Sequence, residues 1–435
     1  MGKKISVFWF RRDLRIEDNK GLTEALKGPF PVLPIFIFDP NILEDLPSND
    51  ARVSFIFDVV QKIRSQFQKE YNGAMGLFHD DPMMVFKKLQ ETYDIQAVFT
   101  NTDYEPYARQ RDGELKEYLS SQKISFHSFK DQVIFEKNEV VKENGDPYVV
   151  YTPYMKRWKS KFNAATDLVL DDTESFLDNI LTDGDFPSIT LHEMGFTKAT
   201  IEVPDFNVTP TLIGKYEATR NYPAINGTSH LGPHLRFGTV SVRQMVQKAQ
   251  EEKNQTFWNE LIWREFFMQI LWHFPHTVDN AFKKKYDRIS WRNNEAEFEK
   301  WKNGQTGYAL VDAGMRELNA TGYMHNRVRM LVASFLCKHL LIDWRWGEAY
   351  FAEKLLDYEL SSNVGNWQWA AGSGVDAAPY FRIFNPMTQA DKFDKDRKYI
   401  KKWVPEYDSD SYAHKIVDHK EARERCLAAY KEALS

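Results

Sequence analysis

The chain has 435 residues, 43% of them hydrophobic and 27% charged, which is enough for two or three domains with cores of their own. Its formal net charge of -5 excludes a globally basic nucleic-acid binder of the histone type but leaves room for a local basic face. Only Cys337 and Cys426 are present, without metal-ligand spacing, so a disulfide framework and a zinc site are excluded and we expect a reducing, cytoplasmic setting.

The first 131 residues alternate between predicted strands and helices. The segments between the strands have helical length, and residues 52–71 show apolar side chains at helical spacing. This alternation is typical of an α/β domain with a doubly wound parallel five-stranded sheet. No glycine-rich nucleotide loop follows any strand, so the ligand of this domain stays open. The predicted strands are 5–10, 32–38, 74–78, 97–100 and 125–129.

Residues 132–195 show no sustained period and carry a turn at 144–147, so we interpret them as a connector between domains with one helix near 154–161. From residue 196 to 435 the pattern becomes helical, which predicts an all-α domain. No stretch approaches 18 consecutive apolar residues, so we expect no membrane-spanning helix. The clearest helical segments are 240–250, 257–272, 309–318, 327–341 and 346–356.

The stretch 357–386 combines carboxylates, asparagines and tryptophans with a run of glycine and alanine. Large flat side chains with a few polar groups are typical of a pocket for a planar ligand, and a buried turn between two helices is the alternative. Three further segments carry polar groups. Glu260 and Arg264, four residues apart among aromatic side chains, suit either polar recognition or a surface ion pair. Residues 323–330 begin a helix with two arginines, which favours anion binding or helix pairing, and the Thr-Ser turn at 227–232 suits phosphate binding or a helix cap.

These segments, taken together, resemble the photolyase and cryptochrome flavoproteins along nearly the whole chain, most closely the class I cyclobutane pyrimidine dimer photolyases. Several long motifs in the order of that family make the resemblance specific. They are FWFRRDLRIEDN at 8–19, GTSHLGPHLRFG at 227–238, NELIWREF at 259–266, TGYMHNRVRM at 321–330, LLIDWR at 340–345, NVGNWQWAAGSGVDAAPYFRIFNP at 363–386 and IVDHKEARERCLAAY at 416–430.

The resemblance implies an N-terminal antenna domain and a helical domain that binds FAD, reduced and anionic in the active form. It assigns phosphate and ribose contacts to Tyr216, Thr228, Ser229, His230, Leu231 and Arg264. It assigns contacts with the flavin ring to Asn326, Arg329, Asp357, Glu359 and Asn363. An electron relay to the flavin is implied for Trp367, Trp344 and Trp291, although each tryptophan alone also suits a core position.

On the substrate side, the resemblance implies a pocket for a flipped-out dimer, since photolyases are themselves among the enzymes that extrude their target from the duplex. Glu260, Trp263, Asn326, Met330 and Trp369 match the residues that line this pocket, and Arg220 and Arg327 match contacts with the DNA backbone. The expected activity is light-driven repair of cyclobutane pyrimidine dimers in DNA by a monomer with no obligate protein partner. A blue-light receptor of the cryptochrome type, with the same flavin and tryptophans, is the alternative.

The sequence departs from the family pattern at several positions. Glu359 stands where relatives usually carry Asp, and Phe257 replaces a usual Trp. Glu105 matches a carboxylate of the folate-binding members, but the lysine that accompanies it there has no clear match. The second, antenna chromophore is therefore a folate, a deazaflavin or a flavin, or is absent.

Overall fold

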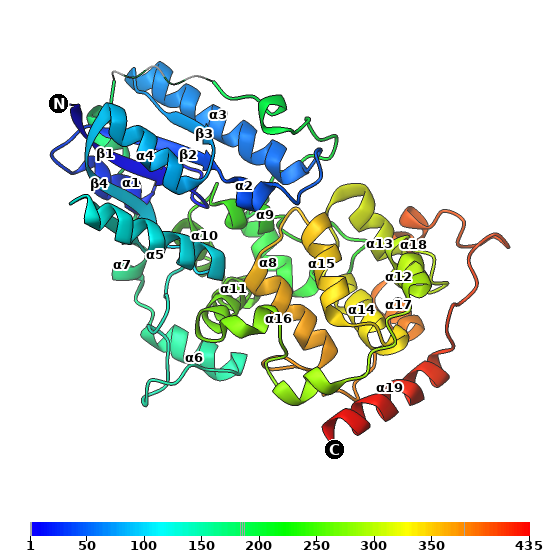
Figure 1. The fold of residues 1–435 in the computed structure, drawn as a ribbon. Coiled ribbons are helices and arrows are strands. Elements are labelled where there is room, and N and C mark those ends of the chain that lie inside the picture. Colours follow the sequence, from blue (N-terminus) through cyan, green and yellow to red (C-terminus); the bar gives the residue numbers. More distant parts are fainter. Residues whose placement is uncertain (1, 183, 185, 187, 378) are drawn as a thin grey trace. The chain divides into compact units, whose positions relative to one another are not determined.

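The computed structural model describes residues 2–182, 184, 186, 188–377 and 379–435 (Figure 1). Within these ranges no helix has both the length and the apolar character needed to cross a membrane. The chain forms two compact units. The first comprises residues 1–136, 162–206 and 231–250, and the second comprises 137–161, 207–230 and 251–435. The functional domain boundaries at 131 and 195 stay predictions.

The first unit is built on a parallel sheet with the strand order β3-β2-β1-β4-β5. The predicted five-stranded α/β fold is thereby confirmed. Strand β1 lies in the centre, where Phe8 pairs with Pro34 of β2 and with Phe99 of β4. The strands are β1 (Lys3–Phe10), β2 (Val32–Phe38), β3 (Gly76–His79), β4 (Tyr93–Asn101) and β5 (Ser125–Phe129).

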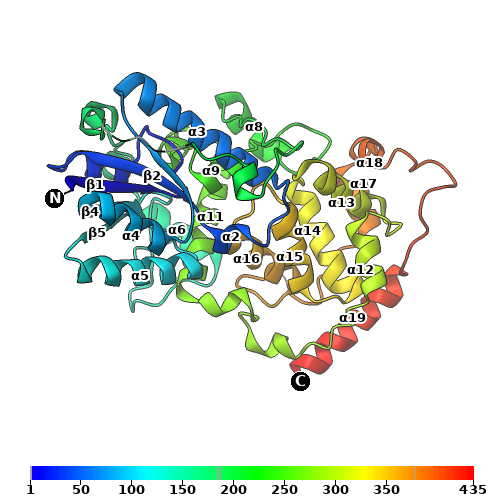
Figure 2. The same ribbon diagram turned by 45° about the horizontal axis from the view of Figure 1, so that its top comes forward.

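Helices cover both faces of this sheet because β1 and β2 are apolar on both sides. Phe8 and Phe10 pack in one cluster with residues of α1 (Lys20–Leu26) and α3 (Ala51–Tyr71). Val7 and Trp9 pack on the other face with residues of α4 (Pro82–Thr92) and α5 (Pro106–Ser121), and Figure 2 shows α3 on the opposite side of the sheet from α4 and α5. The remaining helices of this unit include α2 (Pro40–Leu43), α7 (Ala164–Asp167), α9 (Gly232–Phe237) and α10 (Val242–Gln250).

The second unit is helical, as predicted for the C-terminal half. Its largest core gathers side chains of α13 to α16 around Trp301 and Trp367, both nearly inaccessible to solvent. The helices are α6 (Tyr151–Lys161), α8 (Pro210–Thr219), α11 (Thr256–His273), α12 (Glu295–Lys302), α13 (Ala309–Thr321), α14 (Asn326–Ser334), α15 (Trp344–Lys354), α16 (Leu360–Ala371), α17 (Pro386–Phe393), α18 (Lys398–Trp403) and α19 (His419–Leu434).

The helix predicted at 327–341 differs in one respect from the structure. It begins at Asn326, where the His325 ring accepts a hydrogen bond from the Arg327 N–H, but it changes at Phe335 into the π-helix η5 (Phe335–Leu340). Leu341 then ends the helix with a left-handed φ of 53°. Apolar spacing does not distinguish an α-turn from the wider π-turn, so the sequence pattern alone predicted one uniform helix.

Candidate functional site

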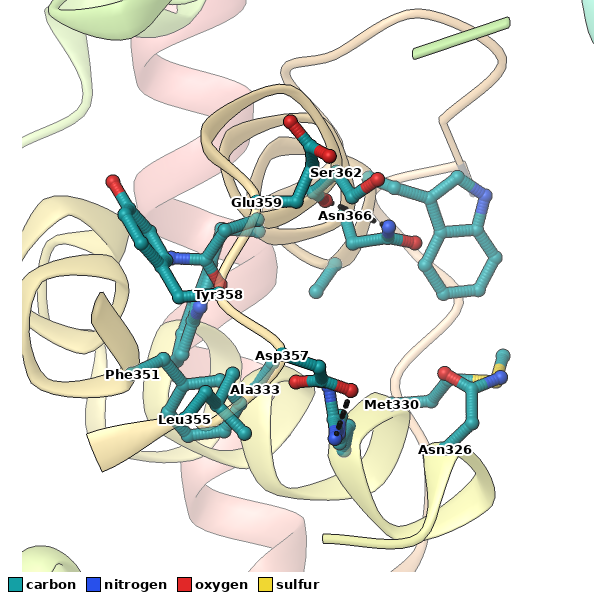
Figure 3. Close-up of a pocket in the computed structure, with 15 residues that line it drawn as sticks. Asn326, Met330, Ala333, Phe351, Leu355, Asp357, Tyr358, Glu359, Ser362 and Asn366 are labelled. Atoms are coloured by element: carbon teal, nitrogen blue, oxygen red, sulfur yellow. Dashed lines mark hydrogen bonds and ion pairs between the residues drawn. The ribbon is translucent and has the colours of Figure 1, made fainter. Parts of the chain in front are cut away.

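A pocket in the second unit lies between α14, residues 355–359 and α16. It encloses about 590 Å³ of space, part of it open to solvent. Figure 3 shows Glu359, Ser362 and Asn366 on one side of this space and Asn326 and Met330 on the other. The lining residues that the sequence had singled out are Asn326, Arg329, Met330, Asp357, Glu359, Asn363, Trp367 and Trp369.

Arg329 and Asp357 form a bidentate ion pair at the wall of the pocket. The two guanidinium nitrogens Nη1 and Nη2 donate to the two carboxylate oxygens at 3.0 and 2.9 Å, and Nε donates to the carbonyl of Met324 at 2.6 Å. Burial alone would lower the pKa of Arg329, but the Asp357 carboxylate outweighs burial and raises it. Arg329 therefore remains charged, and the pair ties the loop at 357 to α14 (Figure 3).

Asn363 projects from α16 and is held by a partner on α15. Its Nδ2 donates to the backbone carbonyl of Glu348 at 3.1 Å and to the carboxylate Oε1 of the same residue at 2.9 Å. Burial raises the pKa of Glu348, and the hydrogen bond from Asn363 offsets part of that rise. With both amide hydrogens directed to Glu348, the Oδ1 atom of Asn363 is left as a hydrogen-bond acceptor.

Glu359, the position at which the sequence departs from its relatives, is buried and faces Arg264. Its Oε2 lies 3.8 Å from Nη2 of Arg264, and the two side chains are only 7% and 12% exposed. A residue assigned to the flavin ring thus meets one assigned to phosphate or ribose. The longer glutamate side chain is compatible with this ion pair.

The residues assigned to phosphate and ribose come from α8 and the turn at 227–230. The hydroxyls of Thr228 and Tyr323 are 3.1 Å apart, and the ring centroids of His230 and Tyr323 are 4.8 Å apart. Tyr216 packs edge-on against Phe257, the residue that replaces a usual tryptophan, at 5.4 Å. Ser229 accepts a backbone hydrogen bond from Asn207 N–H, whereas Leu231 is buried in the first unit.

Two buried ring nitrogens near this turn allow a test of whether the residues fit a cofactor. Among the described residues, Nδ1 of His230 and Nε2 of His325 have no hydrogen-bond partner. Burial lowers the pKa of both rings, that of His325 to about 4, so both are neutral near pH 7. Buried polar atoms of this kind normally have a hydrogen-bond partner, and a polar group bound here would provide one. These two ring nitrogens, together with a pocket lined by flat aromatic side chains, fit a flavin nucleotide.

Of the residues assigned to DNA and to the lesion, Asn326, Met330 and Trp369 line the pocket, whereas the others form ion pairs and ring contacts outside its lining. Arg220, at the end of α8, donates from Nη1 to the carboxylate of Glu260 on α11. Burial raises the pKa of Glu260, and the nearby Arg220 offsets part of that rise. Arg327 donates to Oδ1 of Asn221 at 2.5 Å and lies over the ring of Phe393 at 4.5 Å.

The three tryptophans assigned to a relay lie in different environments. Trp367 lines the pocket, is 2% exposed, and packs edge-on against Phe351 at 4.9 Å. Trp344 is buried at the first turn of α15, and Trp291 is partly exposed and lies edge-on to Tyr430 at 6.1 Å. Because Trp367 is buried at the pocket and Trp291 is partly exposed, the three side chains suit an electron route from the pocket to the surface. The relay stays a prediction.

Glu105, the candidate antenna residue, belongs to an ion cluster at the carboxyl ends of the strands of the first unit. Its Oε1 accepts hydrogen bonds from Arg12 at 3.0 Å and from Arg236 at 2.9 Å. These contacts provide a structural role for the carboxylate. Its role toward an antenna chromophore stays a prediction.

Several residues of the site were not anticipated from the sequence. Ser362 and Asn366 line the pocket one helical turn apart on α16, so the spacing of three residues from Glu359 and from Asn363 could have suggested them. Glu348 carried no local signal, because it meets Asn363 only through the packing of α15 on α16. Tyr151, which stacks on Trp263, lies in the segment interpreted as a connector.

Comparison with known proteins gives matches over most of the chain. Residues 6–171 match the family model described as DNA photolyase, and residues 257–411 match the model described as the FAD binding domain of DNA photolyase. A deoxyribodipyrimidine photo-lyase of Synechococcus is 37% identical over 92% of this chain and 87% of its own.

Two solved structures are similar over the full length. A bacterial class III photolyase from Agrobacterium tumefaciens has a TM-score of 0.88 and 32% identity, covering 100% of this chain and 98% of its own. An archaeal photolyase from Sulfolobus tokodaii, solved with two FAD molecules, has a TM-score of 0.83 and 34% identity, covering 98% of this chain and 99% of its own.

Proposed function

Because this chain belongs to the DNA photolyase family, we propose that it is a light-driven lyase that splits cyclobutane pyrimidine dimers in DNA. The matches confirm the resemblance inferred from the sequence motifs, and they confirm FAD as the cofactor. The motifs resemble class I enzymes most closely, whereas the similar Agrobacterium structure is of a class III photolyase, so we propose the reaction and not the subclass. The observation that carries the proposal is the pocket, in which residues assigned to flavin, relay and lesion lie together.

Bound FAD, reduced and anionic, supplies under blue light the electron that opens the cyclobutane ring and takes it back afterwards, so that no net redox change remains. Arg329, Asp357 and Asn363 would hold the flavin ring, and the turn at 228–230 would hold its phosphates. The ion pair contributes a fixed, planar pair of charges, and Asn363 contributes an acceptor whose direction is set by Glu348. Trp367, Trp344 and Trp291 would return the flavin to its reduced form.

The lesion side is built from apolar walls and one carboxylate. Trp263, Trp369 and Met330 offer flat or flexible apolar surface to a dimer whose pairing and stacking are already weakened. Glu260, whose pKa is raised by burial, holds a proton to a higher pH than an exposed glutamate does, and it would hydrogen-bond the dimer as negative charge develops on it. Arg220 and Arg327 would bind the phosphates and position the duplex without reading its sequence.

Asn326 and Met330 favour the cyclobutane dimer over the (6-4) lesion. The resemblance to the family implies two histidines, four residues apart, at these positions in the members that repair the (6-4) lesion. That repair requires proton transfer, which neither an amide nor a thioether performs, whereas a cyclobutane ring opens once an electron is delivered. The amide of Asn326, exposed at the first turn of α14, can still bind the dimer by hydrogen bonds.

The test is to illuminate the reduced holoprotein with an oligonucleotide that carries one thymine dimer and to measure restored thymines by chromatography. A dark sample and an oligonucleotide with a (6-4) lesion are the controls, and only the illuminated dimer should be repaired. Persistence of the dimer with flavin bound and reduced would overturn the proposal. A blue-light receptor of the cryptochrome type would instead show equal affinity for damaged and undamaged DNA.

A further inference from the structure

Trp263 on α11 has one face covered by another ring. The ring centroids of Trp263 and Tyr151 are 3.5 Å apart and the two planes differ by 7°, so the rings stack face to face. Phe266 and Phe267 flank the indole, each with its centroid at 5.6 Å. Trp263 remains partly exposed while Tyr151 is buried, so Tyr151 fills the inner side of the pair.

Polar contacts fix Tyr151 in place from two directions. Its hydroxyl donates to the carbonyl of Asn259 at 2.7 Å, which is the carbonyl that the helical pattern pairs with the N–H of Trp263, four residues on. Its backbone N–H, at the first turn of α6, donates to the carboxylate of Asp376 at 3.2 Å. Burial raises the pKa of Tyr151, and the charge of Glu260 raises it further, so its phenol stays protonated.

The rest of α6 supports this placement. The helix buries Tyr151, Tyr154 and Trp158, which recur at helical spacing and pack on α11. Trp158 donates from Nε1 to the buried carboxylate of Glu265 at 2.6 Å, and Tyr154 packs against Phe266 at 5.3 Å. Figure 1 and Figure 2 both show α6 beside α11. A helix anchored by several independent contacts therefore presents one flat ring to the indole.

We propose that Tyr151 is a positioning residue for lesion recognition: by stacking on the inner face of Trp263, it fixes the plane in which the outer face meets a flipped pyrimidine dimer. This role rests on the proposed function, because it presumes that Trp263 is a wall of the dimer pocket. An indole that is free to rotate would lose rotamer entropy on binding, whereas a fixed one has already lost it. Tyr151 thereby raises selectivity for damaged DNA without contacting the lesion itself.

The experiment compares affinity for dimer-containing and undamaged duplexes, measured in the dark on the holoprotein by fluorescence anisotropy. In Y151L the ring is lost, and affinity for the dimer should fall about fivefold, the order of magnitude of one aromatic pair, with affinity for undamaged DNA unchanged. Y151F keeps the ring and loses only the hydroxyl contact, so it should retain most of the selectivity. Y151M, whose unbranched and flexible side chain adapts to the space left by the ring, is a second variant if Y151L does not fold.

Y154L is the matched control, because it removes a buried tyrosine from the same helix without a ring contact to Trp263. It should lower thermal stability but leave the ratio of the two affinities unchanged. In a W263A background, Y151L should add no further loss, since there is no indole left to position. The role of Tyr151 would be overturned by equal losses of affinity for both duplexes, by an unchanged affinity ratio in Y151L and Y151M, or by additive losses with W263A. These outcomes would leave the proposed function standing. A wild-type protein with no preference for dimers would overturn the proposed function as well.

Discussion

The ion pair between Arg329 and Asp357 provides the most direct test of how the pocket is held. Replacing Asp357 with asparagine keeps the shape of the side chain and removes its charge. Arg329 would then keep the carbonyl of Met324 and one amide oxygen as acceptors, but its partly buried guanidinium would lose the opposite charge and the second oxygen that it faces. We expect D357N to destabilise the second unit and to lower its FAD content, because the loop at 357 would no longer be tied to α14.

The magnitude follows from burial. Arg329 and Asp357 are 22% and 18% exposed, so the pair lies between a fully buried pair, whose disruption costs about 3 to 5 kcal/mol, and an exposed pair worth about 0 to 1 kcal/mol. Its bidentate geometry places it nearer the buried case, and we expect a loss of about 2 to 3 kcal/mol. Lys401 and Asp408, at 52% and 68% exposed, form the matched surface pair, and D408N should cost less than about 0.5 kcal/mol.

Urea unfolding of the FAD-depleted proteins, followed by circular dichroism and by tryptophan fluorescence, measures both losses without a contribution from the ligand. Coincident transitions are required, because a chain with two compact units can unfold in more than one step. The double variant R329M/D357N completes the cycle and should cost less than the sum of the single variants. If D357N shifts the midpoint no more than D408N does, or if the single losses add, the ion pair does not hold the pocket.

Three further predictions concern pH and packing. In R220A the pKa of Glu260, already raised above 4.5 by burial, should rise further. The folded protein then keeps a proton that the unfolded chain has lost, so R220A should lose stability relative to wild type as pH rises above about 4.5. Urea midpoints measure this slope, and E260Q should abolish it. His325, with its pKa lowered to about 4 from 6.5, binds a proton more readily in the unfolded chain, so the stability of the protein should fall as pH falls from 6.5 to about 4. The variant H325N preserves a side-chain acceptor at the N-terminus of α14 and should reduce this loss of stability. In G347A the new Cβ would lie 2.1 Å from the Trp367 ring, so we expect a cost of about 1 to 3 kcal/mol by calorimetry, and an unchanged melting temperature would refute the close packing.

The fold could be predicted from local patterns wherever one element is apolar throughout or along one face. The central strands are buried on both sides, so their apolar runs marked them in the sequence, and α3 showed its helical spacing. Within residues 132–195 one helix was predicted near 154–161, and α6 (Tyr151–Lys161) lies there, but the partner on which it packs could not be predicted. Helix α6 is short and becomes part of the core only through α11, more than 100 residues later in the chain, and no local period records such a contact.

The residues of the candidate site were predicted from sequence motifs, but the geometry in which they meet was not predicted. The residue types on α14, on α16 and in the loop before α16 suggested a pocket, and the structure brings eight of them to one. Which side chain faces which depends on packing: Asn363 meets Glu348 and not solvent, and Glu359 meets Arg264. Glu105 shows the same limit, since nothing in its sequence neighbourhood indicates that Arg236, 131 residues away, provides one of its partners.

Burial separates the ion pairs of the site into two kinds. Three arginines are expected to bind an anion or the flavin, and each of them already faces a carboxylate. A phosphate could therefore bind one of these arginines only by displacing that carboxylate. The flavin-side pairs are at most 22% exposed, and opening them would leave a buried charge, so they serve as fixed walls. The pair on the DNA side is about one-third exposed and screened by solvent, so its opening costs little. We therefore expect that Arg220 can turn to a DNA phosphate, and its departure would raise the pKa of Glu260. The pairs are Arg264 with Glu359, Arg329 with Asp357, and Arg220 with Glu260.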